Sequence, residues 1–187
     1  MVGPGKTLAG GLLFASFATV AAAQSFEVVG SCREGLPNGA YELRTTDGRL
    51  RAVGAFAHGK KTGTFIFWTT NGARVAVIPF EEDARKGTVA VWYPGDRDWI
   101  EGRRKLEARY VDDRRHGLTR SWYATGAQRS EYRYEHGRLI EARAWSETGR
   151  ALPEAEAREQ ALRDIESDQS VMDTLVGVLD DHLPRCD

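Results

Sequence analysis

Short stretches of alternating hydrophobic and polar residues, each ending near a glycine, run through most of this chain. Phe65 and Phe67 share one face of such a stretch, and Val89 and Val91 hold the same places further along the chain. A period of two residues is typical of β-strands, and glycine supplies the backbone freedom that tight turns need. The pattern therefore predicts a mainly β protein, an antiparallel meander of stacked β-hairpins.

A repeated unit sets the spacing of these strands. It reads aromatic, two residues, Gly or Asp, three residues, Gly, four residues, Trp, three residues, Gly. Five copies open at Cys32, Phe56, Phe80, Tyr110 and Tyr134, so the period is 24 residues with six extra residues in one interval. The first copy is degenerate, because Cys replaces the aromatic residue and Arg replaces Trp. Each unit has room for one hairpin, and stacked repeats place equivalent side chains in ladders.

We therefore expect residues 32–152 to form one continuous antiparallel sheet of about ten strands. The opening aromatic residues should occupy equivalent positions, with the tryptophans in register. As domains, we assign residues 24–152 to the repeats and residues 153–187 to a C-terminal helix and tail.

Residues 153–183 change in character, because glycine nearly disappears and apolar residues recur at helical spacing. Pro153 suits the first position of a helix. The segment Ser167–Ser170 leaves open whether there is one long helix or two collinear ones. Thirty helical residues span about 45 Å, which matches the width of about ten strands, so the helix is expected on or beside the sheet.

Residues 1–23 have the pattern of a secretion signal. Lys6 gives a positive start, residues 8–20 are apolar, and three alanines precede Gln24. The alternative is an uncleaved membrane anchor, for which the apolar stretch is short. We expect a periplasmic or secreted protein.

The two cysteines, Cys32 and Cys186, predict a disulfide, since exported chains commonly oxidise their cysteines. The helix is about long enough to return Cys186 to the first repeat. Two unrelated thiols, or a bond between chains, are the alternatives.

Acidic and basic residues nearly balance, with 26 Lys and Arg against 27 Asp and Glu, so we expect no nucleic-acid partner. His58 and His136 occupy the same turn slot, and no histidine has a partner at ligand spacing, so no metal site is expected. A nucleophile elbow and a phosphate-binding loop are both missing from the sequence. We expect no catalytic residues, no cofactor and no enzyme activity.

The tryptophans are the most numerous candidates for binding. Four of them share one repeat slot, where ladder packing is the leading interpretation: Trp68, Trp92, Trp122 and Trp145. Trp99 and Ile100 instead lie in the 96–102 insertion, an apolar pair among charges, and are predicted as partner-binding anchors. The alternative is that Trp99 folds back onto the sheet.

The repeated spacing resembles the MORN repeat, in the variant form common in bacterial proteins that are often labelled antitoxin-like. This resemblance covers residues 32–152 and implies stacked hairpins that bind or scaffold, with no catalytic set. The function expected is an exported module that binds another protein in the envelope or extracellular space. A glycan- or lipid-binding envelope module and an immunity protein are the alternatives, and membrane contact is not indicated.

Overall fold

The structure of the chain is a computed structural model that describes residues 25–95 and 102–187. These residues form an eleven-stranded sheet and one helix. The elements are β1 (Phe26–Arg33), β2 (Leu36–Thr45), β3 (Leu50–Ala57), β4 (Lys60–Trp68), β5 (Arg74–Glu81), β6 (Ala84–Arg85), β7 (Gly87–Trp92), β8 (Arg104–Val111), β9 (Arg114–Trp122), β10 (Gln128–Glu135), β11 (Arg138–Ala144) and α1 (Glu154–Asp180).

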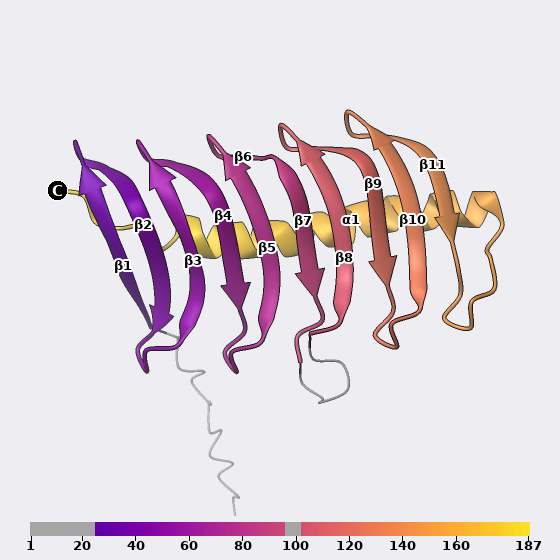
Figure 1. Cartoon of the computed structure of the whole chain (residues 1–187), viewed down its shortest axis with the longest axis horizontal. Coiled ribbons are helices and arrows are strands. Elements are labelled where there is room, and N and C mark those ends of the chain that lie inside the picture. The colour runs from indigo at the N-terminus through magenta and orange to yellow at the C-terminus, as the bar shows by residue number, and fades with distance from the viewer. Residues whose placement is uncertain (1–24, 96–101) are drawn as a thin grey trace, which may run out of the picture.

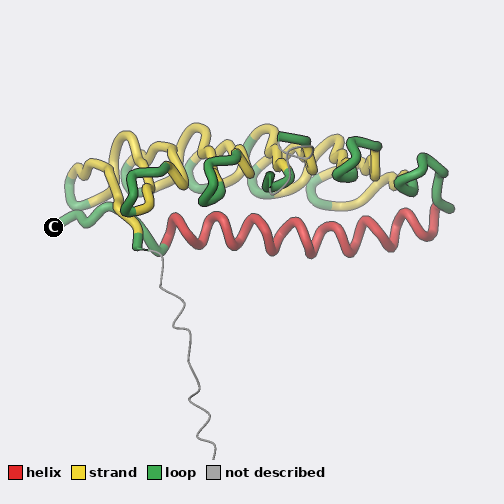
Figure 2. The backbone as a smooth tube through the Cα atoms, turned by 90° about the horizontal axis from the view of Figure 1, so that it is seen from below, coloured by secondary structure: helices red, strands yellow, loops and turns green. Residues whose placement is uncertain are grey.

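The strands follow one another across the sheet in sequence order, each antiparallel to the last, with the two-residue β6 pairing only with β5. Helix α1 runs back beneath one face of this meander, from β11 toward β1 (Figure 1). Turning the molecule shows the helix on a single side of the sheet (Figure 2). The expected fold class is confirmed.

The residues that open the later repeats occupy equivalent positions, as the spacing predicts. Phe56, Phe80, Tyr110 and Tyr134 lie at or near the ends of β3, β5, β8 and β10, and all four are buried. The sheet itself begins earlier than expected. Its first strand starts at Phe26 because residues 26–33 take the place that residues 50–57 take in the next repeat.

Neighbouring repeats are joined by a backbone hydrogen bond that recurs at one turn. Gly59 N–H donates to the carbonyl of Pro37, at 2.9 Å between nitrogen and oxygen. The same bond recurs in the later repeats as Asp83 to Lys61, Asp113 to Arg85 and Gly137 to Arg115. The turn residue before each donor has positive φ, and His58 and His136 are two of them. Positive φ at this position belongs to the hairpin turn itself, and polar residues are common in such turns.

One continuous ladder of side chains, which we call the inner row, faces the helix. Its members pair from strand to strand across the whole sheet: Val28, Leu43, Ala52, Phe67, Ala76, Val91, Leu106, Ser121, Ser130 and Ala144. All but Val28 are buried. Large and small side chains mix along the row, and α1 packs against this surface.

Helix α1 is continuous over its 27 residues, so residues 167–170 do not break it. Its C-terminal half buries Met172 and Leu179 in an apolar cluster with strands β1 to β5, β7 and β8. Its N-terminal end buries Ala157 and Ala161 against β10 and β11. No described helix is long and apolar enough to cross a membrane.

A polar seam separates these two apolar clusters. Arg115 of β9 donates to the Asp168 carboxylate at 2.8 Å, and Arg129 and the Tyr132 hydroxyl both donate to Asp164. Burial raises the pKa of the Asp168 carboxyl, while the Arg115 guanidinium opposes that rise. The seam favours one register of α1 on the sheet, because Asp164 and Asp168 each meet a specific cation of the strands.

Candidate binding face

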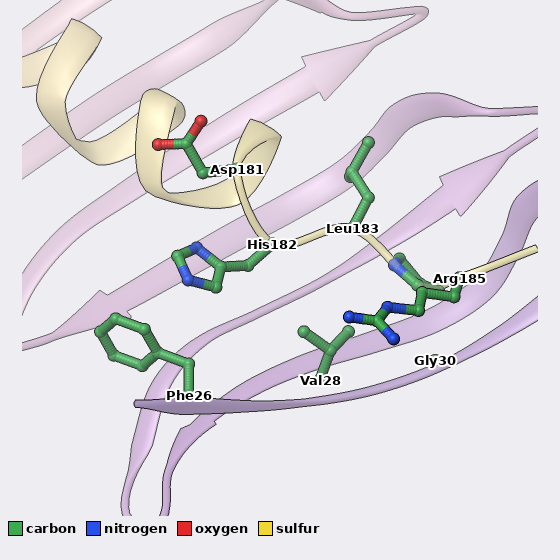
Figure 3. A pocket seen from close by; sticks show the side chains of 8 residues that line it. Phe26, Val28, Gly30, Asp181, His182, Leu183 and Arg185 are labelled. Carbon is green, nitrogen blue, oxygen red and sulfur yellow. The ribbon is translucent and has the colours of Figure 1, made fainter. Parts of the chain in front are cut away.

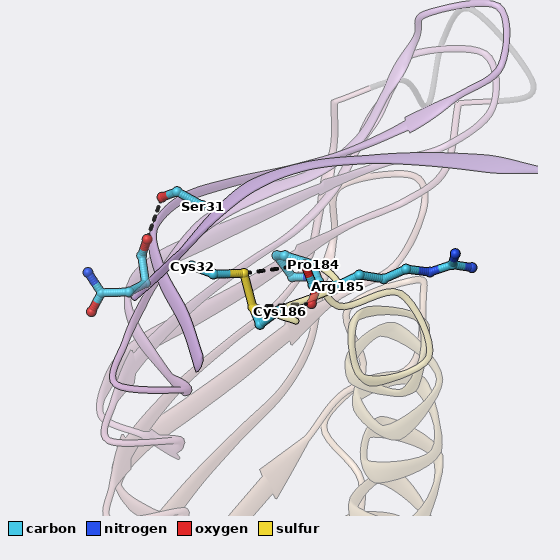
Figure 4. Close-up of a disulfide and its surroundings, with 6 residues drawn as sticks. Ser31, Cys32, Pro184, Arg185 and Cys186 are labelled. Atoms are coloured by element: carbon cyan, nitrogen blue, oxygen red, sulfur yellow. Dashed lines mark hydrogen bonds between the residues drawn. A yellow bond between two sulfur atoms is a disulfide. The ribbon is translucent and has the colours of Figure 1, made fainter. Parts of the chain in front are cut away.

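The disulfide joins Cys32, at the end of β1, to Cys186 in the C-terminal tail. The two Cα atoms lie 5.6 Å apart across a sequence separation of 154 residues. Figure 4 shows the tail passing beside β1 to reach this bond. The helix therefore does return the tail to the first repeat, as its length predicts.

A hollow lies between β1 and this tail (Figure 3). Phe26 and Val28 form its apolar side, and His182 and Arg185 face them from the tail. The rings of Phe26 and His182 meet edge to face at 4.8 Å between centroids, and the Tyr41 hydroxyl donates to the His182 carbonyl at 2.8 Å. These contacts hold the tail on the sheet and bring together no nucleophile with a base.

Trp99 and Ile100, the predicted partner-binding anchors, lie outside the described residues. Their role stays a prediction. Among the described residues, no three His, Cys, Asp or Glu side chains gather as a metal site. His116 of β9 and His136, in the turn between β10 and β11, do meet, with ring centroids 4.9 Å apart.

The repeat tryptophans lie on the face of the sheet that α1 does not cover. Each directly follows an inner-row residue, so alternation turns it outward. Trp92 is only 7% exposed, and Trp68, Trp122 and Trp145 are half-buried. Arg74 stacks over the Trp92 ring at 4.0 Å to the centroid. The tryptophans thus form a partly covered row along one margin of the outer face.

Tyrosines that follow two of these tryptophans bind the next repeat. The Tyr93 hydroxyl donates to the Trp122 carbonyl, and the Tyr123 hydroxyl donates to the Trp145 carbonyl, each at 2.8 Å. These bonds reach main-chain carbonyls, so they join neighbouring repeats at the tryptophan positions whatever the indole rings contact.

A second continuous ladder, which we call the outer row, crosses the middle of this face. Each member is the sequence neighbour of an inner-row residue and so points the opposite way. The outer row is Val29, Glu42, Val53, Ile66, Val77, Ala90, Glu107, Arg120, Glu131 and Arg143.

Eight of the ten residues of the outer row form two chemically distinct groups, which we call the apolar half and the charged half, and Val29 and Glu42 precede both. The apolar half is four consecutive residues across β3, β4, β5 and β7, from Val53 to Ala90. Ala90 is only 7% exposed, and the other three are half-buried. Four residues of alternating charge follow across β8 to β11, from Glu107 to Arg143. The same repeat slots thus change from apolar to ionic halfway along the sheet.

Ion pairs hold the charged half in place. Arg120 contacts Glu131 at 2.9 Å, and Arg143 reaches Glu131 at 4.0 Å. Beside the row, Arg133 and Arg143 both pair with Glu141. The hydrogen bond from Arg133, with the Arg143 charge, holds the pKa of Glu141 below its ordinary value. These side chains form a charge network on strands, which fixes their positions better than a loop would.

The outer row was not predicted from the sequence, because the repeat pattern is defined by its glycines and aromatic residues. The sequence does contain a signal for this row: the residues adjoining the buried strand positions are apolar from Val53 to Ala90 and charged from Glu107 to Arg143, although Glu42 of the first repeat is also charged. Their common face requires strand register, and the sequence does not specify register where bulges occur.

A scan against models of protein families gives no match for this chain, and no curated protein matches it at a significant level. The resemblance to MORN repeats therefore rests on the spacing of the repeat residues alone and stays a prediction.

Proposed function

We propose that this chain is an exported, non-enzymatic module that binds another protein through the outer face of its sheet. The proposal rests on one observation: the helix covers one face of the sheet and leaves the other face uncovered. Helix α1 packs along the inner face, and no described element packs on the outer face. The apolar half of the outer row is the kind of surface that protein partners cover.

Two features that indicate export are in line with the same proposal. The disulfide is compatible with an oxidising compartment, and the N-terminal pattern is typical of a secretion signal. The backbone of the meander also suits a MORN-like array that serves as a binding surface. Each repeat is hydrogen-bonded to the next, which holds the side chains of the face in fixed positions.

Capture from an envelope extract tests the proposal. The bait is residues 24–187, and the matched bait carries Ile66→Glu and Val77→Glu, which place two charges in the apolar half. Because both side chains lie on the outer face, we expect the variant to remain folded by circular dichroism and to lose the captured protein. A protein that binds both baits equally would contradict use of this face.

The Trp row favours one second candidate, a glycan-binding module, since half-exposed indoles stack on sugar rings. Binding to purified envelope glycan that survives Ile66→Glu with Val77→Glu but is lost in Trp68→Ala would support that function instead. An immunity protein is a special case of the proposed function in which the bound partner is a toxin. A toxin gene beside the gene for this chain would support it.

A further inference from the structure

We infer that the occupant of the outer face is a single amphipathic α-helix of the partner protein, lying across the strands along the outer row. The inference rests on the proposed function, because it names the kind of protein element that the face receives. Three properties of the row support the inference. They are its length, its apolar and charged halves, and its partial likeness to the inner face on which α1 packs.

The dimensions of the row suit a helix. The apolar half spans three steps between strands, about 14 Å, which is the length of about ten helical residues. The whole row spans nine steps, about 43 Å, or about 29 helical residues. Helix α1 crosses the same strands on the inner face with 27 residues. A partner helix of similar length would therefore cover the row from end to end.

The inner face shows which helix such a row receives. There, α1 places Met172 and Leu179 over the early strands, and it places Asp164 and Asp168 against the cations Arg129 and Arg115 of the later strands. The outer row shares the first part of this order, since it is apolar across β3 to β7 and ionic from β8 onward, whereas the inner face becomes apolar again where Ala157 and Ala161 pack on β10 and β11. The partner helix is thus expected to carry an apolar stripe on one half and alternating charges on the other.

The charged half gives the helix its orientation. Glu107 pairs with Arg104, and Arg120 pairs with Glu131. The side chains of Glu107 and Arg120 are still 34% and 42% exposed, so a partner's charges can reach these pairs from solvent. Charge order of this kind contributes specificity and register more than affinity. The apolar half supplies the buried area.

Other occupants fit the row less well. A second copy of this chain, placed face to face about a two-fold axis between Ile66 and Val77, would set Glu42 against Glu107, which are like charges. A partner strand added by backbone pairing needs a free sheet edge, whereas the apolar half lies on strands that are paired on both sides. A helix needs only the side chains of the face.

Photo-crosslinking in the producing cell measures the geometry of the occupant. The probes are Ile66→p-benzoylphenylalanine in β4 and Leu118→p-benzoylphenylalanine in β9, since Leu118 is 44% exposed and lies on the outer face beside Arg120. The control carries the same residue at Glu159, on the solvent side of α1. Mass spectrometry then locates the crosslinked residues on the partner.

The two probes lie four strand steps apart, about 19 Å. A helix across the strands gives crosslinks about 13 residues apart in one partner segment, whereas an extended segment gives about 6. We expect the helical spacing, with apolar residues at i, i+3, i+4 and i+7 around the site reached from Ile66. Crosslinks at extended spacing, to another copy of this chain, to glycan or lipid, or no more frequent than at Glu159 would overturn the inference.

A charge swap tests the orientation separately. Arg120→Glu combined with Glu131→Arg keeps the net charge and the internal ion pair, but the four charges from β8 to β11 then read acid, acid, base, base. Because like charges then lie opposite each other on two pairs of strands, we expect a small loss of thermal stability, a fold retained by circular dichroism, and a dissociation constant for the partner that rises at least tenfold. An unchanged dissociation constant would overturn the role of the charged half.

The proposed function and the helix inference fail in different ways. If Ile66→Glu with Val77→Glu keeps the partner, the outer face is not the binding surface and both fall. If that variant loses the partner but the crosslinks have the wrong spacing, the binding function stands and the helix is replaced by another element.

Discussion

At the scale of single residues, the core of the early repeats depends on aromatic rings that meet edge to face. The ring of Phe65 lies 5.6 Å from Phe56 and 5.5 Å from Phe80, between centroids. Gly54 lies beneath Phe65, where a Cβ atom would collide with the ring. Position 54 therefore requires glycine because the Phe65 ring of the next strand fills the space of a Cβ atom, and not because of the backbone angles of Gly54.

Gly54→Ala is therefore expected to destabilise the protein by about 1–3 kcal/mol, because an added methyl in a packed core forces the ring to move. The measurement is the free energy of unfolding from a urea titration. Gly177→Ala is the matched control, since nothing lies near its Cβ position and alanine favours a helix interior, so stability should rise by about 0.5–1 kcal/mol. Equal effects of the two changes would contradict the steric argument.

Tyr41 predicts how stability responds to alkaline pH. Burial, with a smaller effect of the Asp180 charge, raises the pKa of Tyr41 to about 12 from its ordinary value of 10.0. Above pH 10 the unfolded chain loses this proton while the folded protein keeps it, so stability falls as pH rises from 10 to 12. Tyr41→Phe removes that contribution and the hydrogen bond to His182.

We expect Tyr41→Phe to lower stability at pH 7 by about 1 kcal/mol and to make the decline above pH 10 shallower than in the wild type. Urea titrations at pH 7, 9 and 11 measure both effects. Parallel curves for the two proteins across this range would show that Tyr41 does not titrate as its burial requires.

At the scale of elements, the sequence predicted the positions of the hairpins but not the first strand or the contacts between the helix and the sheet. The repeat spacing located the hairpins, and Phe56, Phe80, Tyr110 and Tyr134 confirm it, because a fixed period carries turn chemistry and core positions together. The first strand was not predicted because the repeat unit begins at its aromatic slot, which Cys32 fills in the first copy, so residues 26–31 fell outside the expected sheet although Gly30 takes the place of Gly54. The roles of Lys61, Arg85 and Arg115 were not predicted either, since only the packing of α1 places polar partners beside them.

Two of these helix–sheet pairs should differ greatly in importance. The side chains of Arg115 and Asp168 are 8% and 15% exposed, whereas Asp180 beside Lys61 is 53% exposed. Asp168→Leu leaves a buried guanidinium without its counter-charge and should cost about 3–5 kcal/mol. Asp180→Ala should cost less than about 1 kcal/mol, because water screens an exposed pair. Thermal and urea unfolding measure both.

The double change of Asp168→Leu with Arg115→Met separates charge from packing. Replacing both partners of a buried pair by apolar residues removes the unpaired charge, so most of the lost stability should return. If the double variant were as unstable as Asp168→Leu alone, shape rather than charge would hold α1 at this position.

At the scale of the whole molecule, the sequence predicted a closed arrangement from two lengths, the width of the sheet and the reach of the helix. The disulfide bears out that estimate, since Cys32 and Cys186 meet after 154 residues. The outer row could not be predicted from these two lengths. The row from Val29 to Arg143 exists only once the register of every strand pair is known, and bulges shift that register at several pairs.

Reduction of the disulfide should loosen the molecule from one end. Closing so long a loop stabilises a fold by up to about 5 kcal/mol in the chain-entropy model, and engineered bonds often deliver less. The N-terminal half of α1 keeps its pairs with Arg115 and Arg129, whereas the tail beyond Asp180 depends on Tyr41, Phe26 and the disulfide.

Hydrogen exchange with and without a dithiol measures this order. After reduction, amides of the last helical turns and residues 181–187 should exchange faster, while β4 to β9 keep their protection. The variant with Cys32→Ser and Cys186→Ser should match the reduced wild type and be indifferent to the dithiol. Loss of protection across α1 and the strands together would mean that the bond stabilises the whole sheet cooperatively. In that case the long strand-to-strand ladders, rather than local contacts of the tail, would transmit its effect.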